Sequence, residues 1–221
     1  MNDLTLVIPA KNEEDSLPRV LNELKKYNLK IIIVLEKEDV DTINSIKEYD
    51  FKILYQDNKG YGDALLKGIK NVKTKFFCIF NADGSFNPNE LQNMYDHAVK
   101  ENADFVFGSR YIKGASSEDD TIITFTGNKI FTLIGKIFFS LPISDILYTF
   151  VLGNTEKANA LQLKEKKFSF CVELPILAKK SNYKLISLPS HERSRIAGKK
   201  KVNEFKDGFL ILLSMIKIYF N

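Results

Sequence analysis

Short apolar segments alternate with helical patterns along the first half of the chain. Apolar and β-branched residues fill five segments, which are residues 4–8, 30–35, 51–55, 76–80 and 104–108. Between these segments, apolar residues recur at helical spacing in residues 17–24, 64–72 and 91–98. This alternation predicts an α/β fold in which a mostly parallel sheet is covered by crossover helices.

A polar segment follows each predicted strand. These segments are residues 9–14, 36–39, 56–63, 81–88 and 109–115, and they are rich in Asp, Asn, Gly and Lys. Ligands of open α/β sheets bind beyond the carboxyl ends of the strands. We therefore expect the functional site at this edge of the sheet, with the composition that phosphate and metal binding require.

The length of 221 residues suits one α/β domain with an appended tail. We predict a single domain in residues 1–202 and a C-terminal amphipathic helix in 203–221. The apolar stretch 130–151 contains charged residues and a proline, so it predicts no membrane-spanning helix. Its apolar side chains either join the core, which we favour, or rest on a membrane surface.

The positive charge is concentrated near the C-terminus. Residues 164–221 carry 13 Lys or Arg against 5 acids, whereas residues 1–163 carry 19 against 23. A basic segment suits phosphate groups or anionic lipid, and a solvated lysine-rich face is the alternative. Aromatic residues are not interleaved with these lysines, so we expect no nucleic-acid partner.

The two cysteines, Cys78 and Cys171, lie inside apolar runs and lack metal-binding spacing. We therefore expect buried thiols and no zinc site. The N-terminus begins directly with a predicted strand and lacks a signal-peptide pattern. This predicts a cytoplasmic protein, with peripheral contact to the inner face of the membrane as a further expectation.

Asn81 and Asp83 follow an apolar strand and stand two positions apart, so their side chains project to the same side. Carboxylate and amide oxygens suit Mg²⁺ or Mn²⁺, and the cation would bridge a diphosphate. We predict Asp83 as the direct ligand and catalytic residue, with Ala82 against the nucleotide. The alternative is an ordinary Asn-Ala-Asp-Gly turn.

Two further strand ends carry nucleotide-binding candidates. Pro9 and Ala10 offer a flat backbone wall, and Asn12 and Glu13 can hydrogen-bond a base or ribose. The acids of this segment are equally favourable at a helix N-terminus. After the third strand, the candidates for ligand contact are Lys59, Gly60 and Asp63, in a segment that matches neither a Walker loop nor a GxGxxG fingerprint.

A basic loop occupies residues 189–202 and includes His191, Arg193, Arg195 and Lys201. Such a loop can neutralise the charge that develops on a departing diphosphate. A solvated basic loop is the competing interpretation. His191 alone is more typical of a structural hydrogen-bonding residue than of a base.

Taken in order, these segments resemble the family 2 glycosyltransferases of the GT-A fold, most closely the branch of dolichyl-phosphate mannose synthase and its bacterial polyprenyl-phosphate relatives. The resemblance spans nearly the whole chain, and it implies a nucleotide-binding half in residues 1–110 and an acceptor half in residues 111–202. It implies an inverting enzyme that uses Mg²⁺ or Mn²⁺ to transfer a sugar from a UDP- or GDP-sugar to a glycan hydroxyl or a lipid phosphate, in the synthesis of cell-envelope glycans.

The resemblance carries roles only onto matching residues. It implies base or ribose contact for the Pro-x-x-Asn-Glu pattern, metal binding for the Asp-x-Asp position, acceptor or phosphate contact for the Arg of Gly-Ser-Arg-Tyr, and diphosphate clamping by the closing basic motif. The corresponding residues are Pro9, Asn12, Glu13, Asn81, Asp83, Arg110, Arg195 and Lys201.

Three departures from the family pattern leave details open. Leu35 takes the first place of the usual acid pair after the second strand, which leaves Glu36 as the candidate for base contact. Asn81 replaces the first acid of the metal motif. Residues 148–151 replace the branch's Ser-Gly-Phe-Arg, so the acceptor site is not expected to be that of a mannose synthase.

A hydroxyl acceptor requires a carboxylate to take its proton. Glu173, at a predicted helix start, is the first candidate and Asp145 the second, although Glu173 is equally explained as a helix N-terminal acid. A lipid phosphate needs no base because it is already ionised.

Two other functions are considered. A non-catalytic nucleotide-binding or regulatory module would explain Leu35 and Asn81. A sugar nucleotidylyltransferase is disfavoured because its glycine-rich loop should follow the first strand, where residues 9–14 stand.

Overall fold

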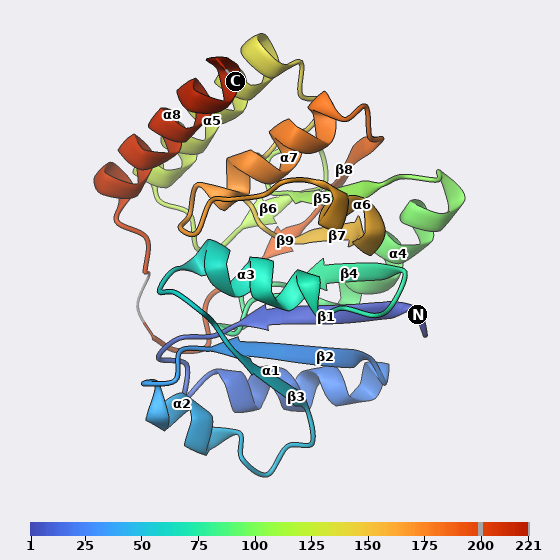
Figure 1. The fold of residues 1–221 in the computed structure, drawn as a ribbon, viewed down its shortest axis with the longest axis vertical. Helices are drawn as coiled ribbons and strands as arrows, with labels where there is room; N and C mark the ends of the chain where they lie inside the picture. Colours follow the sequence, from blue (N-terminus) through green and yellow to red (C-terminus); the bar gives the residue numbers. More distant parts are fainter. Residues whose placement is uncertain (199–200, 221) are drawn as a thin grey trace.

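The computed structural model describes residues 1–198 and 201–220. Within these residues, seven strands form one sheet in the order β3-β2-β1-β4-β7-β5-β8 (Figure 1). The strands are β1 (Leu4–Pro9), β2 (Lys30–Leu35), β3 (Lys52–Tyr55), β4 (Phe76–Ile79), β5 (Phe105–Ser109), β7 (Val151–Asn154) and β8 (Leu185–Pro189). A separate short pair joins β6 (Ser116–Ser117) to β9 (His191–Glu192).

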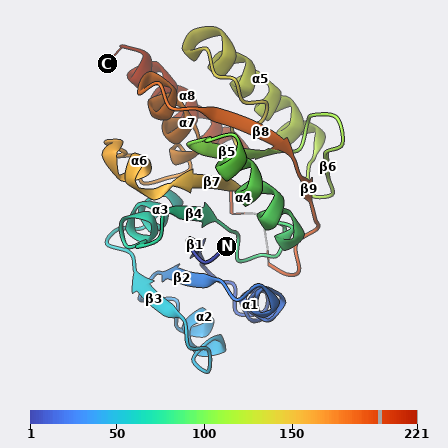
Figure 2. The same cartoon turned by 90° about the vertical axis from the view of Figure 1, so that its right-hand side faces the viewer.

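Helices cover both faces of the sheet (Figure 2). The helices are α1 (Leu17–Leu24), α2 (Val40–Ser45), α3 (Tyr61–Lys70), α4 (Leu91–Lys100), α5 (Ile122–Phe139), α6 (Thr155–Ala160), α7 (Phe170–Lys180) and α8 (Glu204–Phe220), with 3₁₀ turns at Lys25–Tyr27 and Pro88–Glu90. Because strand side chains alternate between faces, Val7 joins the core beneath α3 and α7, whereas Leu6 and Ile8 join the core beneath α1 and α4.

The five predicted strands and three predicted helices are confirmed, with boundaries within a few residues of the expected ones. The sequence pattern did not reveal α2, β7 or β8. Strand β7 is antiparallel and lies between β4 and β5, so the other six strands run parallel to one another. The predicted mostly parallel sheet is therefore confirmed, with one reversed strand in its interior.

Gly153 allows β7 to fit between its neighbours. It is paired with Phe77 of β4 on one side and with Phe105 of β5 on the other. A Cβ atom at this position would lie 2.7 Å from ring carbons of both phenylalanines. The two aromatic rings therefore occupy the space that any side chain at residue 153 would need.

Helices α5 and α8 lie side by side at one end of the molecule (Figure 1). Part of the apolar surface of α5 packs inward, through Phe131, Ile134 and Phe139. Leu133, Ile137 and other apolar side chains of both helices are exposed, so the preference for the core is confirmed for only part of this helix face. The exposed apolar side chains, which we call the α5/α8 face, are Ile122, Ile123, Phe125, Ile130, Leu133, Ile137, Phe138, Phe205, Phe209, Leu213, Ile216, Tyr219 and Phe220.

Of the helices in the described ranges, α5 alone is long and apolar enough to cross a membrane by length and composition. It ends at Phe139, before Pro142, and only 17% of its residues are buried inside the structure. The predicted C-terminal helix is α8, whose described residues end at Phe220. The division of the chain into nucleotide-binding and acceptor halves stays an interpretation.

We predict that Gly153→Ala destabilises the fold by about 2 kcal/mol, because overpacking in a filled core forces the two phenylalanine rings to move. The melting temperature, measured by circular dichroism, should fall by about 4 to 8 °C. Gly127→Ala is the matched control, because a Cβ atom at Gly127 in α5 meets open space. A melting temperature of Gly153→Ala equal to that of the wild type would contradict this account.

Candidate active site

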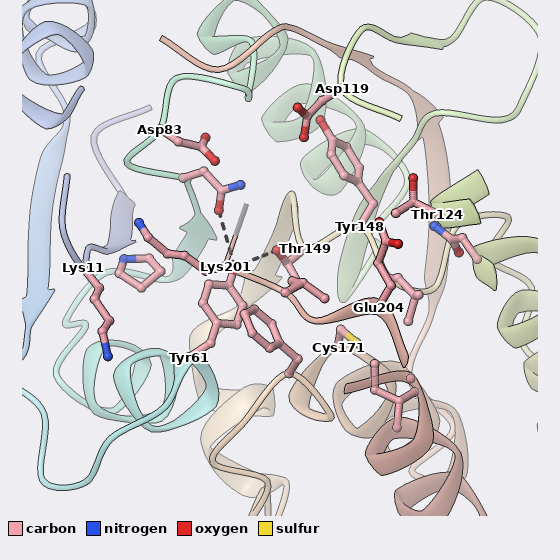
Figure 3. Close-up of a pocket in the computed structure, with 18 of the residues that line it drawn as sticks. Lys11, Tyr61, Asp83, Asp119, Thr124, Tyr148, Thr149, Cys171, Lys201 and Glu204 are labelled. Atoms are coloured by element: carbon pink, nitrogen blue, oxygen red, sulfur yellow. Dashed lines mark hydrogen bonds between the residues drawn. The ribbon is translucent and has the colours of Figure 1, made fainter. Parts of the chain in front are cut away.

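A cavity of about 860 Å³ lies at the carboxyl ends of the parallel strands (Figure 3). Residues that directly follow β1 to β5 line it, among them Glu36, Gln56 and Arg110. The polar segments that follow the predicted strands thus meet at one place. The opposite wall of the cavity comes from α5, α8 and the segment before α7.

Twelve of the predicted site residues line this cavity, and six do not. The lining residues are Pro9, Ala10, Asn12, Glu13, Glu36, Gly60, Asn81, Ala82, Asp83, Arg110, Arg195 and Lys201. Those outside the lining are Lys59, Asp63, Asp145, Glu173, His191 and Arg193. Lys199 and Lys200 of the predicted basic loop lie outside the described residues.

The segment after β1 is held by the start of α2. Asn12 adopts a left-handed φ of 50°, and its backbone N–H donates to Asp39 Oδ2 at 2.7 Å. The backbone N–H of Glu13 donates to Thr42 Oγ1 at 2.9 Å. These contacts direct Asn12 and Glu13 toward the cavity at the entrance to α1.

Asp83 lies in the turn after β4, where one carboxylate oxygen is used by the turn itself. Its Oδ1 accepts a hydrogen bond from the backbone N–H of Ser85 at 3.0 Å. Its Oδ2 lies 3.1 Å from Nη1 of Arg195. Asn81 also faces the cavity, and its amide nitrogen lies 3.4 Å from Ser85 Oγ.

The basic loop, residues 189–202, forms backbone hydrogen bonds with this turn. The N–H of Ile196 donates to the carbonyl of Asp83 at 2.8 Å, and the N–H of Arg193 donates to the carbonyl of Ser85 at 2.8 Å. Gly84 has a φ of 82°, and a Cβ atom there would overlap the side chain of Ile196. Glycine at this position therefore permits both the turn and the close approach of the loop.

Lys11, Arg195 and Lys201 line the cavity, and an acid is paired with each of these three cations. Arg195 contacts Asp119 through Nη2 at 3.0 Å as well as Asp83. Lys201 pairs with Glu13, and Lys11 Nζ lies 2.8 Å from Glu36 Oε1. Across the described lining, acids exceed bases: Glu13, Glu36, Asp83, Asp119, Asp120, Glu192 and Glu204 against Lys11, Arg110, Arg195 and Lys201.

Asp145 is buried beside the cavity and holds Arg110. Its Oδ2 accepts from Nε of Arg110 at 2.8 Å, and its Oδ1 accepts from Nη2 at 3.1 Å. Burial alone would lower the pKa of Arg110, but the charges of Asp145 and Glu192 raise that pKa well above its ordinary value. Asp145 was the second candidate for a base. It does not line the cavity, and both of its carboxylate oxygens accept hydrogen bonds from Arg110.

Glu173, the first candidate for a base, also lies outside the lining. Both carboxylate oxygens accept from the backbone N–H of Lys164, at 2.9 and 3.0 Å, and Oε2 accepts from the N–H of Glu165 at 2.9 Å. Burial raises the pKa of Glu173, and the backbone hydrogen bonds oppose that rise. The carboxylate thus holds a loop in this structure.

The glycines at the start of α3 face the chain's own backbone. A Cβ atom at Gly60 would overlap the carbonyl oxygen of Lys166, and one at Gly62 would overlap that of Glu165. Asp63 accepts at Oδ2 from the N–H of Asn58 at 2.9 Å, which shapes the preceding loop. The absence of a side chain at these glycines therefore allows the backbone of residues 165–167 to approach α3 closely.

His191 and Arg193 secure the basic loop rather than line the cavity. Nε2 of His191 lies 3.1 Å from Glu118 Oε1, and its Nδ1 contacts Ser116. Arg193 donates to both carboxylate oxygens of Glu23 in α1, at 2.9 and 3.0 Å. These contacts fix the loop on either side of Arg195.

Sequence reasoning missed several lining residues. The acidic run 118–120 places Asp119 and Asp120 in the cavity, and it could have been noticed as a charged run before an apolar helix. Tyr61 stacks on Phe168 with ring centroids 5.2 Å apart, and its hydroxyl lies 2.7 Å from Thr149 Oγ1. Other missed residues are Lys11, Gln56, Tyr148, Glu192 and Glu204.

The wall that α5 and α8 contribute to the cavity is mostly apolar, with Thr124, Asn128 and Glu204 as its polar residues. Ile123, Gly127 and Phe131 contribute from α5, and Phe209 and Leu212 contribute from α8. The same two helices carry the exposed α5/α8 face. One cavity therefore joins a charged edge at the strand ends to a mostly apolar wall formed by two surface helices.

The family model described as "Glycosyl transferase family 2" matches residues 5–161. A dolichol-phosphate mannosyltransferase of Pyrococcus furiosus is 26% identical over 90% of this chain and 59% of its own length. A UDP-N-acetylglucosamine–dolichyl-phosphate N-acetylglucosaminyltransferase of Methanococcus voltae is 24% identical over 96% of both chains.

Among solved structures, glucosyl-3-phosphoglycerate synthase of Mycobacterium tuberculosis, in complex with Mn²⁺, uridine diphosphate and phosphoglyceric acid, has a TM-score of 0.77 and 12% identity. The match covers 98% of this chain and 78% of the synthase. This similarity shows the fold, and it confirms the GT-A architecture that the sequence predicts.

We predict that Asp145→Asn lowers the free energy of unfolding by about 3 kcal/mol, because it leaves the buried Arg110 guanidinium short of a charge partner. Urea denaturation measures this change. Lys67→Gln is the control, because its ion pair with the exposed Asp57 lies at the surface and should contribute no more than about 0.5 kcal/mol. Equal losses in the two variants would show that the buried pair has no special role.

Proposed function

This chain belongs to glycosyl transferase family 2, and from that premise we propose that it transfers a sugar from a nucleoside diphosphate to a lipid phosphate, with inversion at the anomeric carbon. The chain is a glycosyltransferase, as its family and its relatives indicate, so a non-catalytic module is set aside. The observation that carries the proposal is that one cavity has both a charged edge and a mostly apolar wall.

The charged edge suits the donor, a UDP- or GDP-sugar. Asn12, Glu13 and Glu36 surround the position for the base and ribose at the ends of β1 and β2. Asp83 and Arg195 flank the position for the diphosphate. The solved synthase of similar fold binds uridine diphosphate with Mn²⁺, which supports a donor of this class.

The residues present fit a divalent metal. In residues 1–198 and 201–220, no three His, Cys, Asp or Glu side chains gather as a complete metal cage. Mg²⁺, however, is commonly held by one or two carboxylates together with substrate phosphates. Asp83, with Asn81 beside it, would hold Mg²⁺ or Mn²⁺, and the cation would supply charge stabilisation to the departing diphosphate.

The acid excess of the lining supports this assignment. Among the described lining residues carboxylates outnumber cations, and their charge repels a diphosphate unless a cation enters with it. Arg195 and Lys201 are held by Asp83, Asp119 and Glu13 in this structure. On donor binding, these two cations exchange carboxylate oxygens for phosphate oxygens and stabilise the leaving group.

The mostly apolar wall suits the chain of a lipid acceptor. The second ionisation of a phosphate monoester has a pKa of about 6, so the acceptor oxygen is already anionic at neutral pH and needs no base. This agrees with the positions of Glu173 and Asp145 outside the lining. A glycan hydroxyl as acceptor would require one of the lining carboxylates to take its proton.

The α5/α8 face supports work at a membrane surface, where a lipid acceptor is found. Many large apolar side chains of these two adjacent helices are exposed, and amphipathic helices bind bilayers through apolar side chains of this kind. We assign the protein to the cytoplasmic side of the membrane as a peripheral enzyme of cell-envelope glycan synthesis. The relatives named for dolichol phosphate support a lipid-phosphate acceptor.

Asp83→Ala should abolish the thermal stabilisation that Mn²⁺ and the matching nucleotide sugar give to the wild type, because the cation loses its carboxylate. Turnover should fall by about 100-fold or more, and EDTA should reduce the wild type to a similar level. Release of nucleoside diphosphate and a thermal-shift screen of UDP- and GDP-sugars measure these effects. Asp96→Ala, an exposed aspartate of α4, is the control. Wild-type turnover by Asp83→Ala would exclude the proposed metal site.

A double change on the α5/α8 face, Ile137→Glu with Ile216→Glu, should weaken binding to phosphatidylglycerol–phosphatidylcholine vesicles by at least about tenfold, because burial of each isoleucine contributes roughly 2 kcal/mol. Neither residue lines the cavity, so donor binding should be unchanged. Co-sedimentation measures the vesicle affinity. Val99→Glu changes an exposed apolar residue of α4, beyond the opposite face of the sheet, and is the control. Unchanged sedimentation of the double variant would show that this face does not meet the membrane.

A further inference from the structure

We propose that Glu173 is a positioning residue that fixes one wall of the donor cavity through residues 164–168. This role rests on the proposed function, because the wall is described as that of a donor site. It takes the place of the role as a base, which was one of the two interpretations of Glu173 that the sequence left open. The inference rests on four successive contacts, which lead from the carboxylate of Glu173 to Asn81.

The first contact anchors the loop before α7. The carboxylate of Glu173 is buried, and it accepts three hydrogen bonds of 2.9 to 3.0 Å from the backbone N–H groups of Lys164 and Glu165. A buried carboxylate is costly unless such donors satisfy it. Replacement of one of these oxygens by an amide nitrogen would therefore remove at least one of the three hydrogen bonds and loosen the loop.

The second contact locks the loop against α3. The carbonyl of Lys166 accepts from the N–H of Asp63 at 3.0 Å. Gly60 and Gly62 have no Cβ atom, and only for that reason can the carbonyls of residues 165–167 come so close. A shift of the loop thus transmits directly to the first turn of α3.

The third and fourth contacts lead into the cavity. Phe168 stacks on Tyr61, with an angle of 22° between the ring planes. The hydroxyl of Tyr61 lies 2.7 Å from Thr149 Oγ1 and 3.5 Å from Oδ1 of Asn81 (Figure 3). Tyr61, Phe168 and Asn81 all line the cavity. Glu173 therefore acts on the donor wall without touching the donor.

A base and a positioning residue differ in what their loss changes. A base must lie within hydrogen-bond reach of the acceptor proton, and its removal lowers turnover while donor binding stays intact. Removal of a residue that sets the donor wall weakens donor binding even when no acceptor is present.

The test is Glu173→Gln, which preserves the size of the side chain but replaces one accepting oxygen by a donating amide. We expect the dissociation constant for Mn²⁺ and the nucleotide sugar, measured by calorimetry without acceptor, to rise about tenfold. Turnover at saturating donor should stay within about threefold of the wild type. Glu156→Gln, an exposed acid in the first turn of α6, is the matched control and should bind donor like the wild type.

Two further variants reach the same wall without changing Glu173. Phe168→Leu removes the ring that stacks on Tyr61, and Gly62→Ala pushes against the carbonyl of Glu165. Both should reproduce the weaker donor binding of Glu173→Gln. Amide hydrogen exchange at residues 164 and 165 should also become faster in Glu173→Gln, which tests the anchoring of the loop independently of any ligand.

Unchanged donor affinity in Glu173→Gln together with a loss of turnover of 100-fold or more would overturn the inference. Such a result would instead support Glu173 as the base that takes the acceptor proton. Unchanged amide exchange at residues 164 and 165 would overturn it as well. If the wild type binds no nucleotide sugar with Mn²⁺, the proposed function fails. If the wild type binds the donor and the wall variants bind it equally well, only the role of Glu173 fails.

Discussion

The backbone pairing between the turn after β4 and residues 193–196 is the contact on which the candidate site depends. Two hydrogen bonds join segments that are more than 100 residues apart in the chain, and Gly84 makes room for them. Through this pairing, Arg195 reaches Asp83. Without it, the acids at the strand ends would face solvent with fewer cations beside them, and the cavity would lack its basic side.

Much of the fold and the nucleotide side of the site could be predicted from the sequence. Periodicity located five strands and three helices because their apolar faces are regular, and parallel topology then brought the strand-end segments of Pro9, Glu36 and Asn81 together. Strand β7 was missed because its four residues, Val-Leu-Gly-Asn, are too short for a pattern and say nothing about strand direction, which depends on pairing with β4 and β5.

The roles of buried acids could not be predicted in the same way. The sequence alone does not distinguish Asp145 and Glu173 from Asp83 as candidates for chemistry. In the structure, however, Asp145 pairs with the distant Arg110, and Glu173 accepts hydrogen bonds from a loop backbone. A carboxylate is available for chemistry only when the fold leaves it facing a cavity, and that depends on three-dimensional packing. The acidic run at Asp119 was missed for the converse reason, because nothing local connects it to Arg195.

The reversed strand β7 also constrains the order in which the molecule can form. Strand β4 pairs with it on one edge and β5 on the other, although β7 follows β5 by more than 40 residues. During synthesis, β4 can pair with β1 on one edge, but its other edge has no native partner until β7, which ends at Asn154, has left the ribosome. An unpaired apolar edge can join another chain, so a nascent chain that stalls before this point is at risk of aggregation.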